Sequence, residues 1–502
     1  MDAASDEIAG HLRNGTWEVV KLPPGKKVIG SSFTFLVKRK ADGAIDRYKA
    51  RLVANGNMQV PDIDFKEVFS PTYRQAAIRL IMAIAAVEDL ELRSVDISQA
   101  FLNGDLKEEI YMKQPQGFEV GGPEYVCRLL KAIYGLCQAS RCWNQKIHTV
   151  LISMGFKRLD SDRSIYLYFR DGVRIIFPIY VDDITLASKS TQKINEVVTE
   201  LSKHFKLHDL GETDSLLGVH ITRDRPNRTI HLSQRQYIVD LLERHGMADC
   251  SPVTTPMVPY SSLTKAMCPV TPEDINTMKS HPYINIVGAI MYLAFFTRPD
   301  IAFTAVVLAR FMSNPGLEHW NALKHLLRYL QGTKDLKLTY KPDDSKELFV
   351  SYCDADHGGN KDNGKSTGGY LMRYAGGAIS WSSKLQPFVA LSTTEAEYVS
   401  ACEAGKEILW LRSILREFGY KIDSPSILRI DNQSALTVSK NPEHHGRMKH
   451  LDLRYFWLRD TVEMGHITPI YVPTSEMPAD LLTKPLARAL VEKFRAVMGL
   501  SS

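Results

Sequence analysis

The sequence lacks the features of a disulfide-bonded, zinc-binding or membrane-spanning protein. Its seven cysteines form no C-x-x-C pair, and their number is odd, which argues against a disulfide framework or a zinc knuckle and fits a reducing compartment. The first residues, MDAASDEIAGHLRNG, are acidic and polar, unlike a signal peptide. The longest apolar runs, such as Ile290 to Phe296, are much shorter than the roughly 20 residues that span a bilayer. We expect no membrane partner.

Composition limits the number of domains but not the function. A net charge of +5 over 502 residues is small, so a nucleic-acid site would have to rest on local basic patches. A chain of this length exceeds a single core, and its pattern changes twice. Strand-like and helix-like segments alternate up to residue 245, prolines interrupt 247–282 before helical patterns resume, and a new pattern begins beyond Pro342.

Two adjacent aspartates, Asp182 and Asp183, interrupt an apolar stretch. Two carboxylates are costly to bury there unless a cation neutralises them. The flanking residues predict two short strands, with the acidic pair at the turn between them. Such a tip suits a magnesium-dependent nucleotidyl transferase, in which one metal activates the attacking hydroxyl and another stabilises the leaving pyrophosphate. Asp96, on a predicted buried strand, is the expected partner of Asp182, and Asp183 is expected to contribute more weakly.

Each of these features also has an ordinary explanation. A lone aspartate on a buried strand usually makes a capping or hydrogen-bonding contact, and an acidic pair near a turn is often solvated. A Tyr-x-Asp-Asp match also arises by chance. The combination of the three aspartates favours catalysis.

Several motifs occur in a fixed order along almost the whole chain, and together they are highly specific. With them the chain resembles the reverse transcriptase and ribonuclease H region of a copia-type long-terminal-repeat retrotransposon Pol polyprotein. The resemblance implies an α+β fold, a right-hand polymerase with fingers, palm and thumb followed by a ribonuclease H-like α/β domain. It assigns 1–245 to fingers and palm, 246–342 to a linker and helical thumb or connection, and 343–502 to the nuclease. The motifs are Asn14–Trp17, Arg47–Ala54, Phe69–Pro71, Val95–Gly104, Tyr134–Leu136, Tyr180–Asp183, Thr297–Ile301 and Ala479–Lys484.

The same resemblance implies the polymerase site residues. Its catalytic triad falls on the aspartates named above. Phe101 occupies the position of an aromatic gate against the ribose 2′-hydroxyl, although a core phenylalanine is the alternative. Lys49 and Arg51, on a basic hairpin of the fingers, are expected to bind triphosphate or template phosphates, with an exposed charged hairpin as the alternative. Gln138 follows Tyr134–Leu136 in a loop expected near the incoming nucleotide.

The chain departs from the family at two positions. Cys137 and Asn55 stand where the family usually has lysine. The loop with Cys137 is expected near the nucleotide and template, so its lost positive charge is expected to weaken binding. Neither change removes a predicted metal ligand.

A second set of carboxylates lies in the C-terminal part. Asp431 ends a predicted strand, and Asp480 lies in Pro478-Ala479-Asp480-Leu481. Asp354 follows another strand, and we prefer it to Asp356 because it is nearer the strand and matches the family position. This set resembles ribonuclease H, in which two metals place a water against an RNA phosphate. Ordinary surface acids are the alternative.

The helix predicted from about Thr393 to Glu417 offers two candidate glutamates for this set. Glu397 heads the apolar stripe of the helix, whereas Glu395 lies about 200° away, towards solvent. We therefore expect Glu397 to be the metal ligand and Glu395 to take part in capping. His444, His445 and His450 fit no zinc spacing and are expected to be structural or substrate-facing.

The predicted function is RNA-directed and DNA-directed DNA synthesis together with degradation of RNA in RNA–DNA hybrids. The expected cofactor is Mg²⁺ or Mn²⁺. The expected partners are an RNA template, a DNA primer, deoxynucleoside triphosphates, a host transfer RNA as primer, and either a second copy of the chain or an integrase. The expected location is cytoplasmic particles, with later nuclear entry.

Two alternatives stay open. The chain begins at a methionine and lacks capsid, protease and integrase regions, so it is expected to be a processed product, a fragment or a relic. A decayed or co-opted copy would bind nucleic acid without catalysis. A polymerase from another class of retroelement is the weaker alternative, because the trailing nuclease pattern argues against it.

Overall fold

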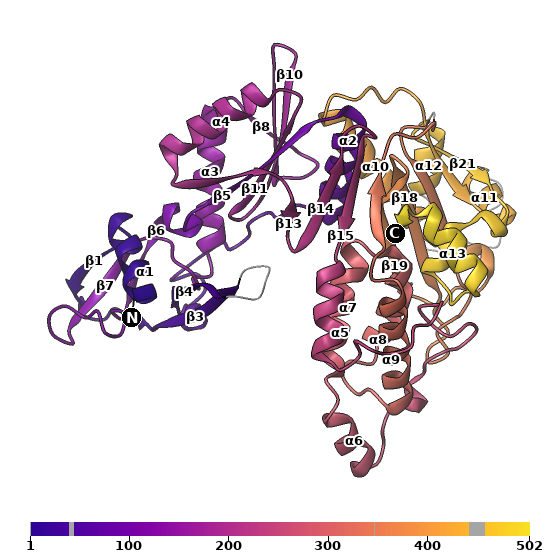
Figure 1. Cartoon of the computed structure of the whole chain (residues 1–502), viewed down its shortest axis with the longest axis horizontal. Helices are drawn as coiled ribbons and strands as arrows, with labels where there is room; N and C mark the ends of the chain where they lie inside the picture. Colours follow the sequence, from indigo (N-terminus) through magenta and orange to yellow (C-terminus); the bar gives the residue numbers. More distant parts are fainter. Residues whose placement is uncertain (1, 40–44, 346, 441–456) are drawn as a thin grey trace. The chain divides into compact units, whose positions relative to one another are not determined.

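The computed structural model describes residues 2–39, 45–345, 347–440 and 457–502, which form an α+β protein as predicted (Figure 1). The chain divides into two compact units. Residues 1–73 and 91–212 form the first unit, and residues 74–90 and 213–502 form the second. The chain therefore enters the second unit at residue 74 and returns to the first unit at residue 91. From residue 213 onwards it belongs to the second unit.

The first unit is built around a six-stranded sheet with the order β12-β5-β11-β10-β9-β8. Two helices, α3 (Ala139–Ser153) and α4 (Thr191–His204), contribute apolar side chains to the same core as the central strands. Helix α4 is amphipathic, with Ile194, Val197, Val198 and Leu201 buried on one face. The strands are β5 (Glu91–Ile97), β8 (Lys157–Arg158), β9 (Ile165–Arg170), β10 (Val173–Tyr180), β11 (Asp183–Ser188) and β12 (Leu207–Glu212).

Two smaller sheets and an N-terminal helix complete the first unit. The antiparallel hairpin of β3 (Ser31–Arg39) and β4 (Ile45–Ala54) is the hairpin predicted for the fingers. Helix α1 (Asp2–Arg13) contacts β4 through a hydrogen bond from the Leu52 amide to Glu7. The remaining sheet has the order β1-β7-β6-β2, with β1 (Trp17–Lys21), β2 (Val28–Ile29), β6 (Asp105–Met112) and β7 (Tyr125–Lys131).

Helix α2 (Gln75–Glu88) belongs to the second unit. Its residues from Ala76 to Ala86 are buried on every face of the helix, as expected for a helix that is enclosed on every side. Arg79 is buried and donates to the carbonyls of Ile379, Phe295 and Phe296 at 2.8, 2.7 and 3.0 Å. A helix within the predicted 1–245 part thus packs in the unit that holds 343–502. The three-part division by function stays a prediction.

The second unit contains helices and two five-stranded sheets. Along the described residues, no helix combines the length and the apolar character needed to cross a membrane. The first sheet has the order β13-β14-β15-β16-β22, with β13 (Ser215–Leu216), β14 (Val219–Asp224), β15 (Thr229–Ser233), β16 (Lys337–Tyr340) and β22 (Leu500–Ser501). The other helices are α5 (Arg235–Arg244), α6 (Pro272–Lys279), α7 (Tyr283–Phe296), α8 (Ala302–Ala309), α9 (Leu317–Gly332), α11 (Gln433–Lys440), α12 (Trp457–Glu463) and α13 (Arg488–Val497).

The other sheet has the order β19-β18-β17-β20-β21. β17 pairs antiparallel with β18, which pairs antiparallel with β19, whereas β17, β20 and β21 run parallel. The long helix α10 (Thr393–Glu417) is capped by Ser392, whose hydroxyl accepts from the Glu395 amide, so the predicted helix is confirmed. The strands are β17 (Val350–Ala355), β18 (Thr367–Tyr374), β19 (Gly377–Leu385), β20 (Ser426–Ile430) and β21 (Ile467–Tyr471).

Candidate active sites

The hairpin predicted around the acidic pair is present. β10 and β11 pair antiparallel, with Tyr180 opposite Asp183 and the turn at Val181 and Asp182. Val181 has φ 58°, a left-handed conformation that a β-branched residue rarely adopts. The buried indole of Trp143 donates a 2.7 Å hydrogen bond from Nε1 to the Val181 carbonyl. This bond from α3 holds the strained turn that presents Asp182.

Two of the predicted polymerase aspartates, Asp96 and Asp183, lie on adjoining strands, and Asp182 lies at the turn next to them. Asp96 of β5 is directly opposite Asp183 of β11 in the antiparallel register. The amide of the next residue, Ile97, donates to the Asp182 carbonyl at 3.2 Å. His208 of β12 is opposite Asp96 on its other side. The fold therefore brings together aspartates that are more than eighty residues apart in the sequence.

A cavity of about 480 Å³ in the first unit unites carboxylates with cations. Asp96 and Asp182 line it, and so do Lys49 and Arg51 of β4, the two residues predicted to bind phosphate. The Arg51 guanidinium lies 4.9 Å from the centre of the Tyr134 ring, which also lines the cavity. Anionic and cationic groups thus share one space large enough for a ligand. The other lining residues include Ala3, Asp6, Glu7, Arg13, Asn14, Arg47, Gln99, Lys206 and His208.

Phe101 and Gln138 do not line this cavity in the described part of the chain. Phe101 is partly buried, and its ring lies edge-on to Tyr134 with 5.0 Å between centroids. Gln138 is 1% exposed; it donates to the Asp64 carbonyl at 2.9 Å and accepts from Gln59 at 3.1 Å. Phe101 is therefore next to a cavity residue, whereas Gln138 is engaged in a buried polar network.

The two positions that depart from the family lie in the same region of the fold. Cys137 is exposed, and its amide donates to the Gln59 side chain at 2.8 Å. The Asn55 amide donates to the Gly30 carbonyl at 2.9 Å. Among the described residues that line the cavity, neither position occurs.

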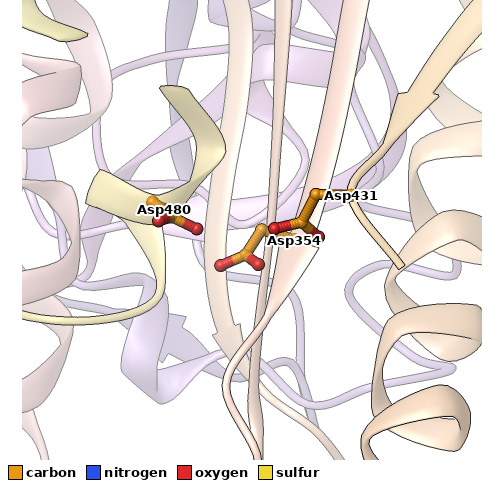
Figure 2. A group of neighbouring side chains, drawn as sticks. All are labelled: Asp354, Asp431 and Asp480. Atoms are coloured by element: carbon orange, nitrogen blue, oxygen red, sulfur yellow. The ribbon is translucent and has the colours of Figure 1, made fainter. Parts of the chain in front are cut away.

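A second carboxylate cluster lies in the second unit. One carboxylate oxygen each from Asp354, Asp431 and Asp480 lies within 4.8 Å of the other two. Figure 2 shows the three side chains next to one another, carried by β17, the end of β20 and the short helix η8 (Pro478–Leu482). Carboxylate oxygens are the ligands that hard divalent cations prefer, so this cluster could hold a metal ion.

Threonines and a lysine surround the cluster. Thr474 donates to Asp431 Oδ2 at 2.7 Å, and Thr483 donates to Asp354. Lys484 Nζ lies 2.9 Å from Asp480 Oδ1 and 3.9 Å from Asp354 Oδ2. These groups orient the carboxylates and partly neutralise their charge.

A glycine brings η8 against the sheet. A Cβ at Gly369 of β18 would lie 2.8 Å from Leu482 Cβ and 2.9 Å from Thr483 Cγ2. A side chain at this position would therefore displace η8, which carries Asp480.

The two candidate glutamates of α10 have different roles. Glu397 is 6% exposed, and its Oε2 is buried without a hydrogen-bond partner in the described structure. Glu395 accepts from the Leu391 amide at 2.8 Å, which confirms its part in capping. However, Glu395 is 1% exposed, so the prediction that it faces solvent is wrong; its carboxylate is bound by the amide of Leu391, just before the helix. Asp356 accepts from the Thr367 amide at 2.7 Å and lies outside the three-carboxylate cluster.

Burial and the charges of neighbouring carboxylates raise the pKa values of Asp431, Asp480 and Glu397. Burial and the neighbouring Asp354 raise the pKa of Asp480 to about 8, although Lys484 opposes this. Burial, and then Asp354, raise the pKa of Asp431. Burial, Asp354 and Asp431 raise the pKa of Glu397 well above its usual range. The metal-free cluster therefore retains protons that free carboxyl groups would lose.

This retention predicts how stability depends on pH without metal. In the unfolded chain Asp480 titrates near pH 4, whereas in the folded protein its pKa is about 8. The folded state binds more protons between these values, so the free energy of unfolding should fall as the pH rises from about 4 to about 8. Thermal unfolding in EDTA across this range measures how steeply the free energy of unfolding falls with pH. Asp480→Asn should make this slope shallower. An identical slope in both proteins would contradict the prediction.

Sequence reasoning missed several residues around both sites. Lys484 belongs to a quoted motif, and its place four residues after Asp480 was a usable signal. Trp143 and Glu7 gave no local signal, because their partners are 38 and 45 residues away. His444, His445 and His450 lie outside the described residues.

Comparison with known proteins identifies the family. Residues 14–259 match the family described as "Reverse transcriptase (RNA-dependent DNA polymerase)". The chain is 43% identical over 504 residues to the Retrovirus-related Pol polyprotein from transposon TNT 1-94 of Nicotiana tabacum, covering 100% of this chain and 38% of that protein. It is 39% identical to the corresponding polyprotein from transposon RE2 of Arabidopsis thaliana, covering 99% of this chain and 34% of that protein.

A shorter relative is covered over its whole length. A putative transposon Ty5-1 protein of Saccharomyces cerevisiae is 35% identical over 316 residues, which are 62% of this chain and 100% of that protein. The chain spans only about a third of the length of the plant polyproteins. The chain belongs to the reverse transcriptase family of copia-type retrotransposon Pol polyproteins.

Proposed function

We propose that this chain synthesises DNA on RNA and DNA templates and cleaves the RNA strand of RNA–DNA hybrids at a separate site. The observation that carries the proposal is the cavity lined by Asp96 and Asp182 on one side and by Lys49 and Arg51 on the other. These four residues lie in the part of the chain that matches the reverse transcriptase family. Carboxylates for cations beside cations for phosphates are the combination that nucleotidyl transfer requires.

The residues at both sites fit divalent cations. The donors are carboxylate oxygens, which Mg²⁺ and Mn²⁺ prefer, and the buried Oε2 of Glu397 has no hydrogen-bond partner in the described residues. When bound, two such ions would lower the pKa of the attacking hydroxyl or water and neutralise charge on the leaving oxygen. Asp96, Asp182 and Asp183 would hold them at the polymerase site. At the nuclease site the ligands would be Asp354, Glu397, Asp431 and Asp480.

Other residues would bind and orient the polymerase substrate. Lys49 and Arg51 would bind the triphosphate of the incoming nucleotide. Arg51 is held over the Tyr134 ring at 4.9 Å, which fixes the direction of its donors. The strained turn at Val181, held by Trp143, would keep the Asp182 carboxylate in place without further rearrangement.

Phe101 would exclude ribonucleotides. Its ring contacts Tyr134, which lines the cavity, so removing the ring would open space beside the cavity wall. Phe101→Ala should therefore raise ribonucleotide incorporation relative to deoxynucleotide incorporation by at least about tenfold. Primer extension with both nucleotide types in competition measures this ratio. Phe169→Ala, which removes an exposed ring from β9, should leave it unchanged. An unchanged ratio in an active Phe101→Ala enzyme would exclude the gate.

The template, primer, location and protein partner that we propose are those that the resemblance to the family implies. The template would be element RNA, a host transfer RNA would prime it, and synthesis would take place in cytoplasmic particles before nuclear entry. A second copy of the chain or an integrase would be the protein partner. The competing proposal is a decayed copy that binds nucleic acid without catalysis, and the losses of lysine at Asn55 and Cys137 favour it.

Primer extension decides between these proposals. The full chain is given an RNA template with a labelled DNA primer, in Mg²⁺ and in EDTA, and in parallel a hybrid with labelled RNA. Extension and cleavage that both require Mg²⁺ support the proposal. A folded, hybrid-binding protein that does neither supports the decayed copy, and Cys137→Lys with Asn55→Lys then tests whether the lost charges are the cause.

A further inference from the structure

Helix α1 contributes to the polymerase cavity although it precedes residue 14, where the match to the reverse transcriptase family begins. Ala3, Asp6, Glu7 and Arg13 line the cavity together with Asp96 and Asp182. A helix that served only to cover apolar surface would not need to place polar side chains in this cavity.

Glu7 connects two walls of the cavity. Its side chain is 7% exposed. Its Oε1 accepts a hydrogen bond from the backbone amide of Leu52 at 3.2 Å, and its Oε2 accepts from the side-chain amide of Gln99 at 2.9 Å. His11 Nε2 lies 3.6 Å from Oε1. Burial raises the pKa of Glu7, but the contacts with His11, Gln99 and Leu52 outweigh it and hold the pKa below its usual range.

Both partners of Glu7 adjoin residues proposed to act in catalysis. Leu52 follows Arg51 on β4, so the bond to its amide fixes the strand that carries the phosphate-binding cations. Gln99 is three residues after Asp96, at the turn that leads from β5 to Phe101. It has φ 50°, a conformation that a glutamine adopts only when its surroundings impose it.

The Gln99 side chain is seated against α1 itself. Asn14 donates to its Oε1 at 3.4 Å. A Cβ at Gly10 would lie 2.4 to 2.9 Å from the Gln99 amide group, so Gly10 leaves the space in which this side chain fits. The left-handed turn after Asp96 is thus fixed by contacts from α1.

We propose that Glu7 is a positioning residue for nucleotide addition, which holds the phosphate-binding strand β4 at a fixed place relative to the turn after Asp96. This inference rests on the proposed polymerase function. It extends the site beyond residues 14–259, which match the reverse transcriptase family model, to a helix whose role is to set the geometry of the triphosphate pocket.

Exchanging the side chains of Glu7 and Gln99 tests the proposal. Glu7→Gln places an amide group against the Gln99 or Leu52 donor, and Gln99→Glu places two carboxylates together, so each should raise the KM for deoxynucleotide by about tenfold. In the double variant, the new amide on α1 would accept from Leu52 and donate to the new carboxylate at the turn, so the pairing is restored. The double variant should return to within about twofold of the wild type. The KM for primer–template and the rate of hybrid cleavage should change little in all three.

The result that would overturn the proposal is a double variant no better than the single ones, or a loss of hybrid cleavage in parallel with synthesis. Amide hydrogen exchange adds a readout that does not need catalysis. Each single variant should speed exchange at the Leu52 amide, and the double variant should slow it again. If the wild type extends no primer, the proposed function fails, and the exchange rates still decide whether Glu7 holds β4 to the turn.

Discussion

Replacing Asp182 by asparagine should abolish DNA synthesis and leave cleavage of RNA in hybrids unchanged. The substitution keeps the size of the side chain at the tip of the β10–β11 hairpin and removes one charged ligand oxygen. Asp182 lines the cavity with Asp96, Lys49 and Arg51, whereas the carboxylates proposed for the nuclease lie in the other unit. Loss of a metal ligand costs several kcal/mol of transition-state stabilisation, so the rate should fall by at least about a thousandfold.

A second turn in the same sheet supplies the control. Asp171 lies between β9 and β10, is exposed and has φ 53°, which asparagine also tolerates. Asp171→Asn should therefore leave both activities within about twofold of the wild type. Primer extension and hybrid cleavage are measured on the same preparations. Equal loss of both activities in Asp182→Asn would indicate misfolding, and retained synthesis would remove Asp182 from the set of ligands.

Local sequence patterns were sufficient where a structure depends on nearby residues. The apolar strands around Asp182 predicted its hairpin, and the stripe of α10 pointed to Glu397, which is buried and lacks a partner at Oε2 within the described residues. The same helical reasoning failed for Glu395, because periodicity describes one helix and not its contacts with the rest of the chain, such as the bond from the Leu391 amide to this carboxylate. The apolar stripe of a helix thus identifies one buried face, but it does not show which parts of the chain bury residues on the other faces.

Long-range contacts explain what the sequence did not reveal. Glu7 carries no motif, and its importance arises from two partners 45 and 92 residues away. Helix α2 is rich in apolar residues, but this composition does not indicate that the helix packs in the second unit. Periodicity therefore predicts elements, whereas the pairing of elements depends on contacts that a single sequence does not display.

Replacing Asp431 by asparagine should have the opposite functional effect to Asp182→Asn and should also stabilise the metal-free protein. Asp431 lies against Asp354 and Asp480, and burial followed by the charge of Asp354 raises its pKa. Asparagine can still accept the 2.7 Å hydrogen bond from Thr474 but removes one of the crowded charges. Hybrid cleavage should fall by at least about a thousandfold, while DNA synthesis should remain within about twofold.

Thermal unfolding separates the loss of a ligand from damage to the fold. In EDTA near pH 8, Asp431→Asn should unfold at a higher temperature than the wild type, because repulsion among the carboxylates is relieved. Adding Mg²⁺ should stabilise the wild type and have a much smaller effect on the variant. Asp423→Asn changes an exposed aspartate before β20 and should alter neither value. A variant that is less stable than the wild type in EDTA, yet gains as much from Mg²⁺, would show that Asp431 supports the fold and is not a metal ligand.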